Sequence, residues 1–153
     1  MEPQRYRFEF DVAAERGEVF RFLADPANLN RVTPSWFDLR ILTPTPLVID
    51  AGAEIDYRLR WRGLPLRWSS RITSWEPHRA FTYVQTRGPY RSFWHEHVFE
   101  VTNSGTRVID RVEWRAWGGS LANRWIRRDL DTIFRHRAGA VVVALPGGCG
   151  STE

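Results

Sequence analysis

The stretch Gly88–Gly118, GPYRSFWHEHVFEVTNSGTRVIDRVEWRAWG, decides how the rest of the chain is interpreted. It predicts two long β-strands joined by a tight turn at Asn103-Ser104-Gly105. Side chains in a strand alternate between the two faces of a sheet. One face of this hairpin therefore carries two rows of residues: Phe93, His95, His97, Phe99 and Val101 from the first strand, and Val108, Asp110, Val112 and Trp114 from the second.

Two histidines and one carboxylate thus share a face with aromatic and branched apolar residues. A polar group in such a surface needs a hydrogen-bond partner. The turn sets position 97 roughly opposite 109–111, so we expect His97 and Asp110 to be neighbours. Two interpretations stay open: a catalytic pair that moves a proton, or a buried His-Asp pair that stabilises the sheet.

The other segments give the order of one strand, two short helices, six strands and one long helix. Residues 5–12 alternate as a half-buried strand, 13–25 have helical spacing that ends at Asp25-Pro26, and 27–30 predict a second short helix. Alternating runs predict further strands at 39–43, 55–61, 66–72 and 81–85. From Ser120, the expected N-cap, helical periodicity continues to Leu145-Pro146.

Tight connections between these strands predict an antiparallel meander, and such a sheet must curve around the long helix to bury its inner face. We therefore expect an α+β fold in which the sheet grips the C-terminal helix. One domain would span residues 1–146, and 147–153 would form a flexible tail. A cleft between sheet and helix is the usual kind of place for a small ligand.

Composition narrows the classes of function. The 8 Trp, 9 Phe and 4 Tyr suit either a thick core or the walls of an apolar cavity. All 22 basic residues are arginine, which excludes Schiff-base chemistry through a lysine. Despite the net charge of +4, the arginines are scattered among acidic residues, so we expect no nucleic-acid partner. The single Cys149 and the absence of long apolar runs predict a cytoplasmic protein without integral membrane association.

The chain resembles the START-like, or SRPBCC, superfamily with its helix-grip fold, in particular the bacterial ligand-binding, polyketide cyclase/dehydrase-like branch. The resemblance covers about residues 3–145. It implies a β-α-α-β6-α order and a family that includes lipid carriers, polyketide aromatases and cyclases, and coenzyme Q-binding proteins. At 117–119 the chain has Trp-Gly-Gly where the branch tends to have Pro-x-Gly. The matching motifs are Phe20–Leu23 with Pro26 and Leu29, Thr33-Pro34-x-Trp36, Ile72-x-x-Trp75-x-Pro77, Gly88-Pro89-Tyr90, Trp94-x-x-His97-x-Phe99, Gly105-Thr106 and Asp110-x-Val112.

Aromatic and apolar residues on the inward faces are candidates for the cavity wall, and each could instead fill the core. Arg137, on the apolar stripe of the last helix, could pair with a ligand carboxylate or extend to the rim. A metal site could be imagined from His95, His97 and Glu96, but only the two histidines point the same way and a third ligand at suitable spacing is missing. We therefore expect no metal and no cofactor. The expected ligand-binding residues are Trp36, Tyr57, Trp61, Trp68, Phe81, Tyr83, Phe93, His95, Phe99, Trp114, Ile126, Leu130, Ile133, Phe134 and Arg137.

Three hypotheses about function follow. The first is a binding module, monomeric or homodimeric, for a small lipid-like, aromatic or polyketide-like ligand. The second is a cyclase or dehydratase that uses His97 and Asp110, with Tyr57 or Tyr83 orienting an oxygen. The third is a lipid or quinone chaperone at a membrane or partner, for which Arg58, Arg60, Arg62 and Arg67 on one hairpin would be an anion-facing surface or only a solvated one.

Overall fold

The computed structural model describes residues 2–44 and 46–147. Seven strands, two α-helices and two short 3-10 turns occur in this part of the chain. Their order is that predicted from the sequence, except that the second short helix is a single 3-10 turn and that a further 3-10 turn, at 35–37, was not predicted. The elements are β1 (Gln4–Val12), α1 (Arg16–Ala24), η1 (Pro26–Asn28), η2 (Ser35–Phe37), β2 (Arg40–Ile41), β3 (Glu54–Trp61), β4 (Leu64–Glu76), β5 (Ala80–Arg87), β6 (Ser92–Thr102), β7 (Gly105–Arg115) and α2 (Gly119–Ala144).

The strands form one antiparallel sheet in the order β1-β7-β6-β5-β4-β3-β2. Strands β2 to β7 follow the chain as a meander, and β1 returns to pair with β7. Register shifts between β4 and β5, at Ser69/Ser70 and Ile72/Ser74, mark irregularities in the ladder. Bulges of this kind bend a strand and increase its twist, which helps the sheet to curve.

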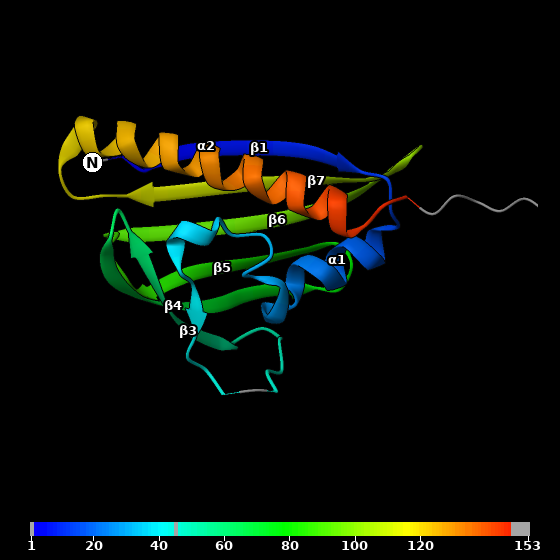
Figure 1. The fold of residues 1–153 in the computed structure, drawn as a ribbon, viewed down its shortest axis with the longest axis horizontal. Helices are drawn as coiled ribbons and strands as arrows, with labels where there is room; N and C mark the ends of the chain where they lie inside the picture. Colours follow the sequence, from blue (N-terminus) through cyan, green and yellow to red (C-terminus); the bar gives the residue numbers. More distant parts are fainter. Residues whose placement is uncertain (1, 45, 148–153) are drawn as a thin grey trace, which may run out of the picture.

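Helix α2 is 26 residues long and lies along the inner face of the sheet. Figure 1 shows it running in front of β1 and β7 and ending beside α1. Its buried residues are Leu130, Phe134, Arg137 and Val141, which fall on one stripe at helical spacing. The Phe134 ring stacks on Tyr6 and Phe8 of β1, with centroid distances of 5.6 and 5.9 Å.

Two clusters of buried residues fill the space inside the sheet. The first lies where α1 and the end of α2 meet the sheet, and it includes Phe20, Phe81, Phe99 and Val141. The second lies farther along α2 and includes Phe93, Val112, Trp114, Leu130 and Phe134.

Three local predictions can be compared with the structure. The register of β6 and β7 sets His97 directly opposite Asp110, as predicted. The N-cap of α2 is Gly118, with φ of 89°, and not Ser120, because the helix already begins at Gly119. Within the predicted tail at 147–153, residues 148–153 lie outside the described part of the chain, and so does Cys149.

Candidate functional site

A cavity of about 560 Å³ lies between α2 and the curved sheet. Pockets of 300–1,000 Å³ are typical for small ligands. Strands β3 to β6, the loops around them and helix α2 all contribute to its wall. The lining residues are Leu29, Thr33, Phe37, Leu39, Tyr57, Leu59, Trp61, Arg62, Leu66, Trp68, Tyr83, Pro89, Tyr90, Phe93, His95, Ala116, Trp117, Ala122, Trp125, Ile126, Asp129, Leu130, Ile133, Phe134 and Arg137.

The exposed members of this lining mark the rim of the cavity. They are Arg62, Pro89, Trp117 and Trp125. At the rim, Asp129 of α2 accepts hydrogen bonds from Trp61 Nε1 at 2.7 Å and from Arg62 at 3.1 Å. The Arg62 guanidinium also lies 4.7 Å from the centre of the Trp125 ring. These contacts join the β3–β4 hairpin to the helix beside the opening.

Eleven of the fifteen predicted ligand-binding residues line this cavity. Alternation along the strands and helical spacing in α2 explain why they could be chosen, since both patterns point side chains to the same interior. Their role in binding stays a prediction. The eleven are Tyr57, Trp61, Trp68, Tyr83, Phe93, His95, Ile126, Leu130, Ile133, Phe134 and Arg137.

Four predicted wall residues lie outside the lining. Trp36 is 51% exposed and stacks on Phe37, which lines the cavity in its place. Phe81 and Phe99 belong to the core under α1. Trp114 is fully buried, and its Nε1 donates a hydrogen bond to Asn123 at 3.1 Å. The inner face of the sheet is longer than the cavity, so that parity alone could not separate wall from core.

Several lining residues were missed by the sequence analysis. Leu59 shares the parity of Tyr57 and Trp61, so alternation could have found it. Pro89 and Tyr90 come from a connection between strands, which has no periodicity to exploit. Asp129 lies four residues after Trp125 on the helix, but only the hairpin contacts reveal its place at the rim.

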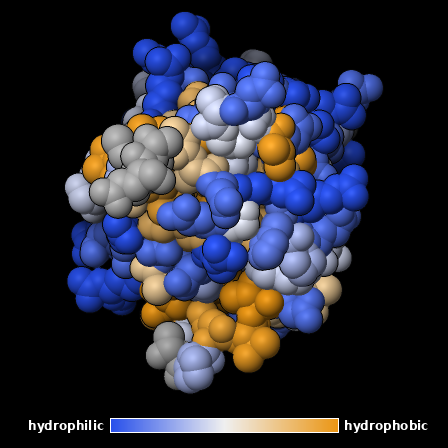
Figure 2. Space-filling model, turned by 90° about the vertical axis from the view of Figure 1, so that its right-hand side faces the viewer, coloured by the Kyte–Doolittle hydropathy of each residue, from blue (hydrophilic) through white to orange (hydrophobic). Residues whose placement is uncertain are grey.

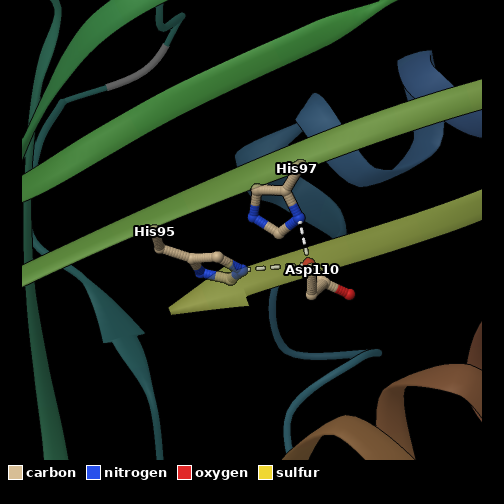
Figure 3. Close-up of side chains that lie close together, drawn as sticks. All are labelled: His95, His97 and Asp110. Atoms are coloured by element: carbon tan, nitrogen blue, oxygen red, sulfur yellow. Dashed lines mark hydrogen bonds and ion pairs between the residues drawn. The ribbon is translucent and has the colours of Figure 1, made fainter. Parts of the chain in front are cut away.

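His95, at the cavity wall, and His97, behind it, both extend from β6 toward Asp110 of β7, as Figure 3 shows. His95 Nε2 lies 2.9 Å from Asp110 Oδ1 in a hydrogen bond. His97 Nδ1 lies 2.7 Å from the same oxygen but is not directed along a hydrogen bond. His97 and Asp110 do not line the cavity, and the His97 ring stacks on Phe81 at 4.5 Å. The predicted catalytic pair is therefore adjacent but separated from the cavity.

His95 connects this buried group to the cavity. Its Nδ1 lies 2.7 Å from the hydroxyl of Tyr83, and both residues line the wall. A continuous chain runs from Tyr83 through His95 to Asp110. With the His95 proton on Nε2, donated to Asp110, its Nδ1 accepts a hydrogen bond from Tyr83.

Electrostatics fixes the protonation of this chain at neutral pH. Burial, reinforced by His97, lowers the pKa of His95 to about 3. Burial raises the pKa of Tyr83 to about 12. Burial on its own would raise the pKa of the Asp110 carboxyl, but His97 and His95 outweigh it and hold that pKa well below its ordinary value. The chain is thus a neutral tyrosine, a neutral histidine and a carboxylate.

His95, His97 and Asp110 form the one group of potential metal ligands found in the described part of the chain. Ligand atoms of His95, His97 and Asp110 lie within 4.8 Å of one another. Both nitrogens approach a single carboxylate oxygen at hydrogen-bonding distances, and no fourth ligand from the described residues joins them. Glu96, on the other face of β6, pairs with Arg111. Three protein ligands with an open position are also what a catalytic zinc site has, so the expectation of no metal stays a prediction.

One group of exposed apolar residues lies in the connection between β2 and β3. Figure 2 shows a largely hydrophilic face with apolar surface gathered at its lower edge, where Figure 1 places the β2–β3 connection. Leu42 and Val48 of this connection are 43% and 83% exposed. Along the described residues, we find no helix with the length and apolar character needed to span a bilayer.

A curved antiparallel sheet that grips a terminal helix over an apolar cavity defines a helix-grip domain, as in START-like proteins. The sequence matches the family described as "Polyketide cyclase / dehydrase and lipid transport" over residues 12–138, and the chain belongs to this family. The resemblance to the START-like superfamily is confirmed. None of the curated proteins matches the sequence significantly.

Solved structures share this fold at low sequence identity. The Zhui aromatase/cyclase from Streptomyces sp. R1128 is 17% identical, with a TM-score of 0.74 over 94% of this chain and 93% of that chain. The major latex-like protein 151 of Panax ginseng is 10% identical, with a TM-score of 0.72 over 95% and 99%. A protein from Chromobacterium violaceum is 12% identical, with a TM-score of 0.74 over 92% and 96%.

Proposed function

We propose that this protein binds a small hydrophobic molecule, of lipid-like, aromatic or polyketide-like chemistry, in the cavity between the sheet and α2. The observation that carries the proposal is the 560 Å³ cavity with its mainly apolar wall. A void of this size in a 153-residue domain forgoes packing that would otherwise stabilise the fold. A bound apolar molecule restores those contacts.

The shape of the wall favours a ligand with flat rings. Trp68 lies at the centre of an aromatic group: its ring stacks on Tyr57 at 6.2 Å and meets Phe93 edge-on at 5.0 Å. Tyr90 approaches Trp68 edge-on at 5.5 Å. Aromatic faces and edges of this kind gain energy beyond the burial of area when another ring lies against them. The hydroxyls of Tyr57 and Tyr83 supply a few polar contacts in the same space.

Binding of the neutral fluorescent probe N-phenyl-1-naphthylamine tests the proposal. We expect saturable binding by the wild-type protein, weakened about tenfold or more in Ile126→Trp, because the added ring occupies the cavity. Leu121→Trp, on the same helix but 65% exposed and outside the lining, is the matched control and should bind like the wild type. Equal affinity in all three proteins would show that the probe binds elsewhere and would contradict the proposal.

A second candidate is proton-transfer catalysis of the cyclase or dehydratase type, supported by the Tyr83–His95–Asp110 chain. Tyr83 would remove a proton from a carbon next to a ligand carbonyl while its own proton passes to His95 Nδ1, leaving an enolate and an imidazolium beside Asp110. We place this second because the pKa values, raised to about 12 on Tyr83 and lowered to about 3 on His95, hold the proton on the tyrosine oxygen.

Exchange of the α-protons of 1-tetralone in D₂O, followed by NMR, tests the catalytic candidate. Wild-type protein should accelerate exchange over buffer, and Tyr83→Phe should abolish the acceleration while N-phenyl-1-naphthylamine still binds. His97→Ala removes only the His-Asp pair that does not reach the cavity. Its exchange rate, compared with that of the wild type, therefore tests the pair through His95 by itself. Exchange at the buffer rate with the wild type would remove this candidate and leave the binding function intact.

A further inference from the structure

Arg137 is a buried cation in the wall of the cavity. It lies on the inner stripe of α2 and is only 8% exposed. Within the described ranges, 2–44 and 46–147, no hydrogen bond or ion pair joins its guanidinium to another residue, and its Nε is buried without a partner. The group lies 5.1 Å from the centre of the Phe134 ring, a contact that attracts the cation without neutralising it.

The carboxylates nearest to the helix are already engaged. Asp129 is bound by Trp61 and Arg62 at the rim. Asp131 accepts from the Tyr6 hydroxyl at 3.0 Å and pairs with Arg135 at 2.8 Å.

Asp110 Oδ1 faces His95 and His97, whereas its Oδ2 is buried without a hydrogen-bond partner; this carboxylate does not line the cavity, and among the described residues no ion pair joins it to Arg137. Among the described residues that line the cavity, Asp129 is the one acidic residue, and Arg62 balances its charge. The cavity wall therefore keeps one cation, Arg137, without a directly bonded anionic partner among the described residues, which is a costly state for a buried group.

Neighbouring polar groups in the wall surround the same point. Burial raises the pKa values of Tyr57 and Tyr83, and the charge of Arg137 opposes that rise; burial and His97 lower the pKa of His95, and the same charge adds to that lowering, so all three lie within reach of its field. Tyr57 is already hydrogen-bonded to Ser70 at 3.2 Å and Tyr83 to His95 at 2.7 Å. Tyr83, whose proton is donated to His95, keeps a lone pair for a ligand donor, whereas Tyr57 can turn its proton toward a ligand oxygen when Ser70 is the donor in their contact.

We propose that the ligand carries an acidic group, a carboxylate, which binds the guanidinium of Arg137 while the apolar body extends along the aromatic wall toward the rim. This inference rests on the proposed binding function. A planar guanidinium matches a carboxylate through two parallel hydrogen bonds, which a phenol or ketone cannot accept as well. Trp125 at the rim and Arg137 are about 18 Å apart along the helix, a span that accommodates an elongated aromatic or aliphatic acid.

A pair of probes that differ in one acidic group tests the inference. The sulfonate 8-anilinonaphthalene-1-sulfonate is N-phenyl-1-naphthylamine with an anionic group added, and it serves as a stand-in for the carboxylate. We expect Arg137→Gln to weaken binding of the sulfonate about tenfold or more beyond its effect on the neutral probe. Arg135→Gln, on the same helix but exposed, is the matched control and should change neither affinity.

The outcomes distinguish the two proposals. If the neutral probe fails to bind the wild type, the binding function itself is wrong. If the neutral probe binds and Arg137→Gln weakens both probes equally or neither, the function stands and the acidic ligand is wrong. Should Arg137→Gln fail to fold, Arg137→Lys keeps the charge but not the planar fork. For that variant we expect a reduced preference for 2-naphthoate over 2-naphthol, and an unchanged preference contradicts the inference.

Discussion

Asp110 shows how a charged residue can be kept in the middle of a sheet. Its side chain is fully buried, and its charge is stabilised by the two imidazoles on the neighbouring strand rather than by water. Protonation of the two histidines is disfavoured in turn, because burial lowers the pKa of both. His95 alone of the three also faces the cavity, through its contact with Tyr83. A ligand anion beside Arg137 would offset one of the charges that lower the pKa of His95.

The pH dependence of stability follows from these shifts. In the unfolded chain a histidine takes up a proton near pH 6.5, whereas His95 in the folded protein stays neutral to about pH 3. The unfolded state therefore binds more protons in this window, and the free energy of unfolding falls as pH falls, by about 1.4 kcal/mol per pH unit for each such histidine. Asp110 adds a further loss below its unfolded pKa of 3.8.

Urea unfolding between pH 7.5 and 4 measures this dependence. The slope should be smaller in His95→Gln than in the wild type, because one proton-linked group is removed. The exposed His136, replaced by glutamine, is the matched control for removing a histidine outside the buried group. A wild-type free energy of unfolding that stays constant from pH 7 to 4.5 would mean that the histidines titrate normally in the folded protein.

At the scale of elements, the β6–β7 hairpin positions the site because it carries all three members of the buried group. After the turn of this hairpin, β7 begins at Gly105, where φ is 152°. A Cβ at this position would lie 2.1 Å from the carbonyl oxygen of Val12. Next to it, Thr106 donates a hydrogen bond to the carbonyl of Ala14 at 2.8 Å. The end of the hairpin is thus fixed against the segment that leads into α1.

Gly105→Ala should lower the free energy of unfolding by about 2–4 kcal/mol, because the added carbon collides with backbone that cannot move away. Gly63→Ala is the matched control, since Gly63 also has positive φ, 80°, but no described atom lies within 4 Å of the point that a Cβ would occupy there. We expect about 1 kcal/mol for this variant, from conformation alone. Similar losses for the two variants, measured by chemical denaturation, would contradict the close approach.

At the scale of the whole molecule, the sheet and α2 enclose the cavity from two sides and are joined by side-chain contacts at its edges. Asp129 joins the helix to the β3–β4 hairpin, and Asp131 joins it to β1 through Tyr6. Between these contacts, the space between the sheet and α2 is a cavity and not a packed core. A molecule that fills this space therefore contacts the sheet and α2 at the same time.

Ligand binding should accordingly raise global stability. At a free concentration of N-phenyl-1-naphthylamine about one hundred times its Kd, the free energy of unfolding should increase by about 2.7 kcal/mol. Ile126→Trp, with the cavity partly filled, should gain much less from the same concentration. Thermal unfolding with and without probe checks this, and an identical rise in both proteins would place the stabilising site outside the cavity.

The sequence by itself determined the order of elements, the antiparallel meander and the pairing of His97 with Asp110. These features depend on local periodicity and on the length of one turn, which are visible in the residues. Tertiary structure alone decided which inward residues meet open space. Phe93 and Phe99 share a strand face, yet only Phe93 lines the cavity, because α1 and the end of α2 cover the sheet around Phe99. Tertiary structure likewise decided that His95, and not His97, lies at the cavity wall. The position of the cavity depends on how elements distant in the sequence pack together, and such packing produces no periodic pattern of residues.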